Sequence, residues 1–153
     1  MTDVRIPLEL APEARDILRS LGEYTARSGL ARGLLELIKL RVSTINGCAF
    51  CIDMHWRILR ELGEPEPRLY GLGAWREQAG YSRRERAALA WAESVTLLPH
   101  GGVSDDVYAA LRAEFTEKEI IDLTYALVTI NGWNRLCVSL RIAPSQPLAE
   151  REP

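Results

Sequence analysis

Apolar side chains recur three and four positions apart along most of the chain, which is the spacing of one face of an α-helix. Two capping boxes, Ser82–Glu85 and Thr116–Glu119, mark helix starts. The pattern predicts helices over residues 11–27, 30–45, 48–62, 66–77, 82–97 and 105–114, and then a long C-terminal helix, "EKEIIDLTYALVTINGWNRLCVSLR". No alternating pattern of useful length indicates a strand. The predicted fold class is therefore all-α, in one domain.

The apolar pattern is interrupted at Asn46-Gly47, and glycine readily adopts the left-handed backbone that ends a helix. The triplet Ile-Asn-Gly recurs at 130–132, within an ungapped similarity between residues 35–48 and 120–133. Two interpretations stay open: two helix ends share the same Asn-Gly stop, or an old duplication kept its thiols in one copy only.

Composition and charge exclude several classes of function. With 153 residues, 47% of them hydrophobic and 26% charged, the chain is typical of one globular domain. A net charge of -2 gives no basic surface for nucleic acid or an anionic membrane. No apolar run approaches the ~20 residues that cross a bilayer, and the N-terminus lacks the apolar segment of a signal peptide. We therefore expect a cytoplasmic protein, in which a Cys-x-x-Cys is more often catalytic or metal-binding than structural.

The stretch "INGCAFCIDMH" places Cys48, Cys51 and His55 on one face of a helix, because each residue advances about 100°. Cys48 falls at or near the N-cap, where free amides and the helix dipole favour thiolate over thiol. A neighbouring imidazole can accept a thiol proton. A thiol that readily ionises, a second thiol three residues away and a nearby imidazole together indicate thiol–disulfide exchange or peroxide reduction.

Glu36 is the candidate fourth member of the site. If residues 30–45 and 48–62 form a hairpin around Asn46-Gly47, Glu36 lies opposite residues 55–57 and can act as a base or orient His55. If the two helices continue in line, Glu36 is about 18 Å from Cys48 by helix rise, and the idea fails. On spacing alone, Glu36 equally suits a solvated face or an ion pair with Lys39 or Arg32.

Other interpretations of the thiols remain open. The same four side chains could hold zinc, although such sites usually bring a second cysteine pair, or both thiols could be inert core residues with His55 bonded to a backbone carbonyl. We expect Cys137 to be a buried small apolar residue and His100 to be an exposed loop residue. The tryptophans are expected in the core or at a subunit interface: Trp56, Trp75, Trp91 and Trp133.

The segment "ELIKLRVSTINGCAFCIDMHWRILRELGE" resembles the core of the alkyl hydroperoxidase D (AhpD-like) branch of the carboxymuconolactone decarboxylase family. The shared pattern is Glu-x11-Cys-x2-Cys-x3-His, and the C-terminal helix also looks like the closing helix of that family. The resemblance covers about residues 30–142, between an N-terminal helical segment, 1–29, and a flexible tail, 143–153. It implies a helical-bundle protomer of a homo-oligomer, commonly a trimer or hexamer.

The resemblance also implies an activity. A peroxidase or disulfide oxidoreductase would reduce hydroperoxides through a cycling Cys48–Cys51 disulfide, with Glu36 and His55 relaying protons and an external dithiol or thiol protein as reductant. No cofactor or metal is implied. By analogy Cys51 attacks the peroxide and Cys48 resolves, whereas the helix argument favours Cys48 as the more acidic thiol. Phe50 stands where some members carry a second histidine, which removes one proton-relay group.

Two other functions stay open beside this one. A cofactor-free decarboxylase-type enzyme would use His55 and Glu36 for acid–base chemistry, although the decarboxylase branch lacks a Cys-x-x-Cys. A non-enzymatic, redox-responsive oligomer would change its assembly on oxidation.

Overall fold

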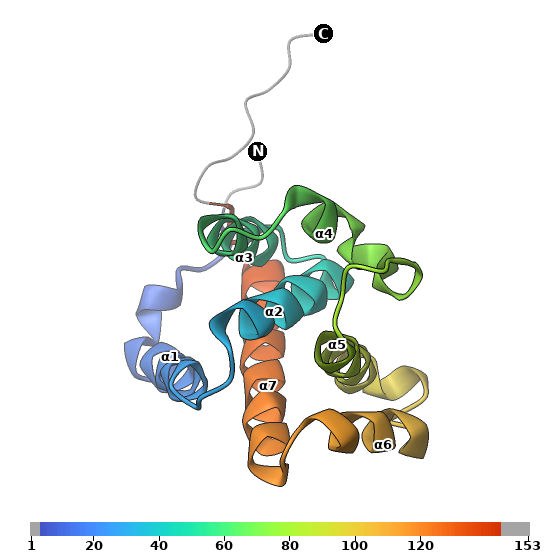
Figure 1. Ribbon diagram of the computed structural model, residues 1–153. Helices are drawn as coiled ribbons and strands as arrows, with labels where there is room; N and C mark the ends of the chain where they lie inside the picture. Colours follow the sequence, from blue (N-terminus) through green and yellow to red (C-terminus); the bar gives the residue numbers. More distant parts are fainter. Residues whose placement is uncertain (1–3, 145–153) are drawn as a thin grey trace, which may run out of the picture.

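The computed structural model describes residues 4–144 as a single all-helical domain, and no strand occurs in that range (Figure 1). Its α-helices are α1 (Pro12–Ala26), α2 (Arg32–Asn46), α3 (Ala49–Glu61), α4 (Glu66–Tyr70), α5 (Arg83–Thr96), α6 (Asp105–Glu114) and α7 (Glu117–Leu140). Three 3-10 helices occupy Leu8–Leu10, Gly71–Glu77 and Leu98–His100. The predicted all-α fold class is confirmed.

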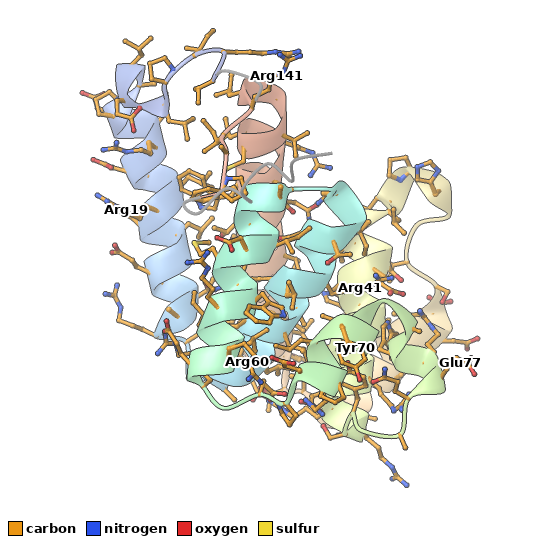
Figure 2. All side chains as sticks on the ribbon, turned by 90° about the horizontal axis from the view of Figure 1, so that it is seen from above. Arg19, Arg41, Arg60, Tyr70, Glu77 and Arg141 are labelled. Carbon is orange, nitrogen blue, oxygen red and sulfur yellow. The ribbon has the colours of Figure 1, made fainter. Side chains whose placement is uncertain are left out.

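The long helix α7 runs through the middle of the molecule, and α2 crosses it (Figure 1). Helix α2 packs against α3, α5 and α7, so it is the centre of the core. Seen from above, α2 and α3 lie side by side between α1 and the α4–α5 side (Figure 2). Arg41 points from α2 toward α5, where it pairs with the buried Glu93. Helix α4 adds the nearly buried Leu69, and five other helices supply the large, fully buried apolar side chains of the core: Leu37, Ile38, Val42, Leu59, Leu89, Leu111, Leu123 and Leu127.

The predicted helix ends are close to the observed ones. Both capping boxes form, with Ser82 starting α5 and Thr116 starting α7. Helix α2 ends at Gly47, whose φ of 67° is the left-handed conformation that glycine adopts without a Cβ clash. Helices α2 and α3 pack against each other, so of the two open alternatives the hairpin is correct and the in-line arrangement is wrong.

The second Ile-Asn-Gly does not end a helix. Helix α7 continues through residues 130–132 to Leu140, so the interpretation as two equivalent helix ends is wrong. Gly132 faces α1, and a Cβ there would lie 3.6 Å from the Leu18 side chain, an ordinary contact. The packing of α7 against α1 and α2 therefore overrides the weak helix propensity of Asn-Gly.

The two Asn-Gly copies meet through their asparagines. Asn46 Nδ2 donates to Asn131 Oδ1 at 3.0 Å and to Asn134 Oδ1 at 2.9 Å. The buried Asn134 in turn donates to Ser43 Oγ at 3.1 Å. A buried amide group without a hydrogen-bond partner lowers the stability of the fold by about 1–3 kcal/mol, so these three asparagines favour the arrangement in which they bond to one another. This network fixes the end of α2, and with it the start of α3, against the middle of α7.

One predicted element has a different form, and one lies partly outside the described residues. The single helix expected over 66–77 is the short α4 followed by a 3-10 helix that begins at Gly71. Gly71 lies so close to the Gln78 side chain that a Cβ would overlap it, and two glycines here weaken an α-helix.

The predicted tail, 143–153, lies outside the described residues from 145 onward. Within the described part, no helix combines the length and apolar character that crossing a membrane requires.

The two glycines of the repeated triplet should respond oppositely to alanine. Gly47→Ala should lower the free energy of unfolding by about 1–2 kcal/mol, because a Cβ is strained in the left-handed region. Gly132→Ala should leave stability unchanged or raise it by up to about 1 kcal/mol, because alanine favours the helix. Urea unfolding of both variants measures this. A stabilising Gly47→Ala would contradict the assigned helix end.

Candidate active site

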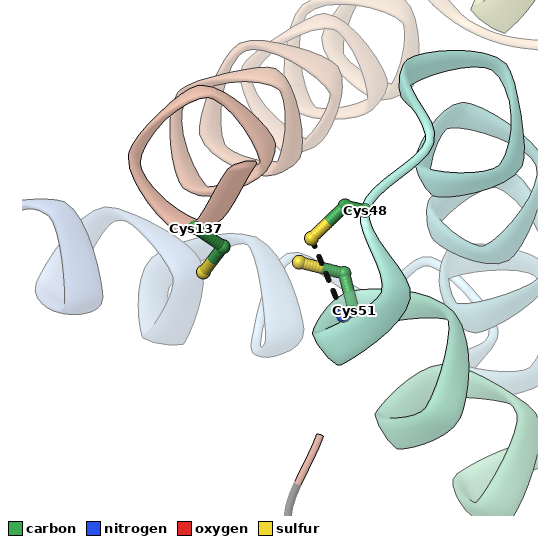
Figure 3. A group of neighbouring side chains, drawn as sticks. All are labelled: Cys48, Cys51 and Cys137. Atoms are coloured by element: carbon green, nitrogen blue, oxygen red, sulfur yellow. Dashed lines mark hydrogen bonds between the residues drawn. The ribbon is translucent and has the colours of Figure 1, made fainter. Parts of the chain in front are cut away.

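Cys48 caps the N-terminus of α3. Its backbone is extended, with φ −86° and ψ 94°, and its Sγ accepts a hydrogen bond from the Cys51 amide at 3.3 Å (Figure 3). Hydrogen bonds from the thiols of Cys137 and Cys51 and from that amide outweigh burial and hold the pKa of Cys48 well below its ordinary value. The sulfur at the positive end of the helix therefore carries the negative charge.

Cys51 lies one turn further along α3 and is equally buried. Its pKa is raised, because its thiol is hydrogen-bonded to Cys137 and Cys48, is buried and lies beside the charge on Cys48. The two sulfurs of the reduced pair thus differ in acidity, with the thiolate favoured on Cys48 and the thiol on Cys51. Such an unequal pair can pass a proton from the second sulfur to the first.

Glu36 and His55 are brought together by the α2–α3 hairpin. His55 Nδ1 lies 2.6 Å from Glu36 Oε2, and Lys39 Nζ lies 2.8 Å from Glu36 Oε1. Burial by itself raises the pKa of Glu36, but the hydrogen bond from His55 and the charge of Lys39 outweigh it, and the pKa falls to about 2. An ionised carboxylate only accepts hydrogen bonds, so Nδ1 carries the proton.

The other nitrogen of His55 has a different environment. Nε2 is buried and has no hydrogen-bond partner among the described protein groups. Because Nδ1 is held by Glu36, the Nε2 atom is the position on the ring where a proton can be taken up or given to a group in the cavity. The pair is therefore arranged as a base oriented by a carboxylate.

An apolar cavity of about 470 Å³ connects the two halves of the site. It lies between α1, α3 and the C-terminal part of α7, and Cys51 and His55 both line it, whereas Cys48 does not. Charged groups also reach its wall: Arg19 and Glu23 from α1, both exposed, and Lys39 from α2. Its apolar lining is formed mainly by Leu8, Phe50, Met54, Ile130, Trp133 and Ile142.

Three expectations for single residues can now be compared with the structure. Trp75 is buried in the core as expected, but Trp133 lines the cavity. His100 is exposed, as predicted. Phe50, at the position between the cysteines, contributes an apolar ring to the cavity wall rather than a proton-relay group.

Cys137 is buried in the core, as expected, but it also lies beside the other two thiols, which the sequence did not predict. Its Sγ and those of Cys48 and Cys51 all lie within 4.8 Å of one another, although Cys137 comes from α7 (Figure 3). A hydrogen bond to Cys48 raises the pKa of Cys137 to about 11. The spacing Ile130–Asn134–Cys137 marks a buried stripe of α7, but nothing in the sequence says which helix that stripe contacts.

The cluster that could hold a metal ion also differs from the zinc set that the sequence left open. Among the described residues, the three cysteine sulfurs form the set that lies close enough, and neither Glu36 nor His55 belongs to it. A soft ion with metal–sulfur bonds of about 2.3 Å would need the sulfurs about 3.8 Å apart. The zinc set of Glu36, Cys48, Cys51 and His55 is therefore not assembled as one cluster.

Comparisons with known proteins agree with this fold and site. The carboxymuconolactone decarboxylase family model matches residues 12–94. An uncharacterized protein of Bacillus subtilis, YdfG, is 44% identical over 132 residues, which cover 86% of this chain and 90% of YdfG. An alkyl hydroperoxide reductase AhpD of a Methylobacterium species is 55% identical over 38 residues, covering 25% of this chain and 22% of that protein.

A solved structure supports the same relationship. An Agrobacterium tumefaciens protein of unknown function, which carries the name of the antioxidant defence protein AhpD, superposes with a TM-score of 0.89 at 41% identity. The match covers 97% of this chain and 100% of that one. The chain therefore belongs to the carboxymuconolactone decarboxylase family, in its AhpD-like branch.

The buried carboxylate should make stability depend on pH. Because the pKa of Glu36 is lowered from 4.5 to about 2, its ionised form stabilises the folded state above pH 4.5, and this contribution is lost as the pH falls toward 2. Between pH 5.5 and 3 the wild type should lose about 2 kcal/mol more unfolding free energy than Glu36→Gln. Urea unfolding across this range measures the difference. Glu61→Gln, at an exposed position of α3, should follow the wild type; equal pH slopes for all three proteins would contradict the ionised Glu36.

Proposed function

We propose that this protein is a thiol-dependent peroxidase that reduces organic hydroperoxides through a Cys48–Cys51 disulfide, with Glu36 and His55 as the proton relay. The observation that carries the proposal is that Cys51 and His55 line the same apolar cavity, with the Cys48 thiolate directly behind Cys51. A hydroperoxide in that cavity reaches the Cys51 sulfur and the His55 base together. The family relationship to proteins named as alkyl hydroperoxide reductases supports it.

The position of the sulfurs supports an order of reaction. Cys51 is the attacking sulfur because it reaches the cavity, and its proton passes to the Cys48 thiolate or to His55 Nε2. The Cys51 thiolate then attacks the terminal peroxide oxygen. The O–O bond breaks, Cys51 becomes a sulfenic acid, and the alkoxide takes a proton and leaves as an alcohol.

Cys48 completes the oxidation. Its thiolate attacks the Cys51 sulfenic acid, the S–S bond forms, and hydroxide leaves as water after protonation. The two thiols have then lost two electrons and two protons to one hydroperoxide. An external dithiol or thiol protein returns the electrons by thiol–disulfide exchange and opens the disulfide again.

His55 moves protons during both steps. Glu36 holds the ring through Nδ1, so Nε2 can take a proton from a thiol and return it to the leaving oxygen. Lys39 keeps Glu36 ionised and so keeps the ring in this tautomer. Phe50, Met54 and Trp133 exclude water and favour an apolar alkyl group.

The arrangement of Glu36 and His55 also suits a second candidate, a cofactor-free acid–base enzyme of the decarboxylase type. The unpartnered Nε2 in an apolar cavity favours it, because such a base needs no thiol. The two candidates differ in what they require of the cysteines.

An exposed apolar row on α7 supports the expectation of a homo-oligomer. Ile121, Tyr125 and Val128 follow one another at helical spacing and are each about half exposed. Rows of this kind often mark protein–protein contacts. A redox-responsive oligomer without turnover would use the same surface, and kinetic measurements separate it from the enzyme.

Substitution of the site residues should separate these functions. Cys51→Ser should abolish turnover of an organic hydroperoxide with a dithiol reductant, because the attacking sulfur is lost, and Cys48→Ser should lower it, because the Cys48–Cys51 disulfide cannot form. His55→Ala should lower kcat/KM by about 10²-fold or more, because the proton acceptor is lost. Coupled consumption of hydroperoxide and reductant measures these rates.

His100→Ala is the matched control, because it removes the other histidine from an exposed position. It should keep wild-type turnover. Peroxide turnover that persists in the Cys48→Ser/Cys51→Ser double variant would refute the dithiol mechanism. An activity that survives this double variant but not His55→Ala would establish the acid–base candidate instead.

A further inference from the structure

The proposed peroxidase cycle uses two thiols, yet the structure brings three together. Cys137, in the C-terminal part of α7, places its sulfur within 4.8 Å of both Cys48 and Cys51 (Figure 3). All three cysteines are buried and reduced. A disulfide needs the sulfurs about 2 Å apart, so joining any two of them requires rotation of cysteine side chains and a small helix shift.

The three sulfurs differ in whether a molecule in the apolar cavity can contact them. Cys51 and Cys137 both line the apolar cavity, whereas Cys48 lies behind it at the start of α3. A reductant that enters the cavity therefore meets both sulfurs of a Cys51–Cys137 disulfide. It meets only one sulfur of a Cys48–Cys51 disulfide.

The N-cap position also makes Cys48 the best leaving sulfur of the cluster. Its thiolate accepts the Cys51 amide hydrogen at 3.3 Å and lies at the positive end of α3. In thiol–disulfide exchange, the sulfur that is more stable as thiolate leaves faster. Attack on a Cys48–Cys51 disulfide at Cys51 therefore releases Cys48 in the position that stabilises its charge.

We propose that Cys137 is a second resolving thiol, which takes the disulfide over from Cys48 and presents it to the reductant at the cavity wall. The inference rests on the proposed redox function of the Cys48–Cys51 pair. Cys137 gives up its proton and attacks Cys51 Sγ, the Cys51–Cys137 bond forms and the Cys48–Cys51 bond breaks. Cys48 leaves as thiolate with the electron pair of the broken bond, and the proton goes to it or to solvent. The exchange is redox-neutral, so it needs no further oxidant.

The exchange also changes which parts of the chain are joined. A Cys48–Cys51 bond lies within one turn of α3, whereas a Cys51–Cys137 bond ties α3 to α7. The carbonyl of Cys137 accepts the amide of Ile142, a cavity residue. Drawing Cys137 toward α3 therefore moves part of the cavity wall, so the oxidised cavity differs in shape from the reduced one.

Peptide mapping tests the exchange directly. Trypsin places Cys48 and Cys51 together in residues 42–57 and Cys137 in residues 136–141. The native protein is oxidised with one equivalent of diamide, quenched with acid, alkylated with N-ethylmaleimide and digested. We expect the two peptides to be linked, with the single N-ethylmaleimide on Cys48. In Cys137→Ser we expect only an internal disulfide in residues 42–57.

A swap variant provides the matched control. Cys137→Ser/Ser139→Cys keeps one thiol in the same tryptic peptide but moves it to an exposed position, where the present Ser139 hydroxyl bonds the Arg135 carbonyl. We expect no linked peptide from it. Linkage in the swap variant would show unspecific exchange and overturn the proposal, as would an internal disulfide alone in the wild type or N-ethylmaleimide found on Cys51.

The choice of oxidant keeps this test separate from the proposed peroxidase activity. Diamide oxidises thiols without a hydroperoxide, so the linked peptide is expected even if the protein fails to turn over any hydroperoxide. Conversely, full peroxide turnover with no linked peptide would leave the Cys48–Cys51 mechanism intact and refute the role of Cys137. Reduction of the diamide-oxidised protein by dithiothreitol should also be slower in Cys137→Ser than in the wild type.

Discussion

The reversal of the chain at Gly47 is the constraint on which the rest of the site depends. Its left-handed backbone ends α2 and lets α3 return alongside it, which places His55 opposite Glu36 and sets Cys48 at a helix start. Asn46, the residue before it, bonds to two asparagines of α7 and so fixes where the reversal lies. One turn thereby positions a carboxylate, an imidazole and two thiols that would otherwise be spread over 20 residues.

Charge within this site is separated rather than concentrated. Glu36 is ionised against Lys39 and His55, and Cys48 is ionised against the start of α3 and its neighbouring thiols. Between these two anions lie the groups that face the cavity, the Cys51 thiol and the His55 ring. Each buried charge has its own hydrogen bonds, which is what makes a buried charge tolerable. The groups at the cavity wall are left free to exchange protons.

The predictable parts of the molecule are those that depend on neighbours in sequence. Helix starts at Ser82 and Thr116 follow from a side chain bonding to an amide three residues away. The contact between Glu36 and His55 follows from counting residues back from a turn. The second Ile-Asn-Gly shows the limit of such reasoning, because the same three letters end α2 and continue α7. Contacts with the rest of the fold decide between the two outcomes.

The sequence by itself determined the helical class, the break at Asn46-Gly47 and the face shared by the two cysteines and His55, because helical periodicity is a local property of the chain. Whether the chain folds back at that break was left to the tertiary structure, which packs α2 against α3. The family relationship is likewise carried by that local pattern. Only the tertiary structure decided that Cys137 joins the other two thiols, that Trp133 lines a cavity and that Cys48 lies outside it. Periodicity says which face of a helix is buried, but the packing of helices distant in sequence decides what that face touches.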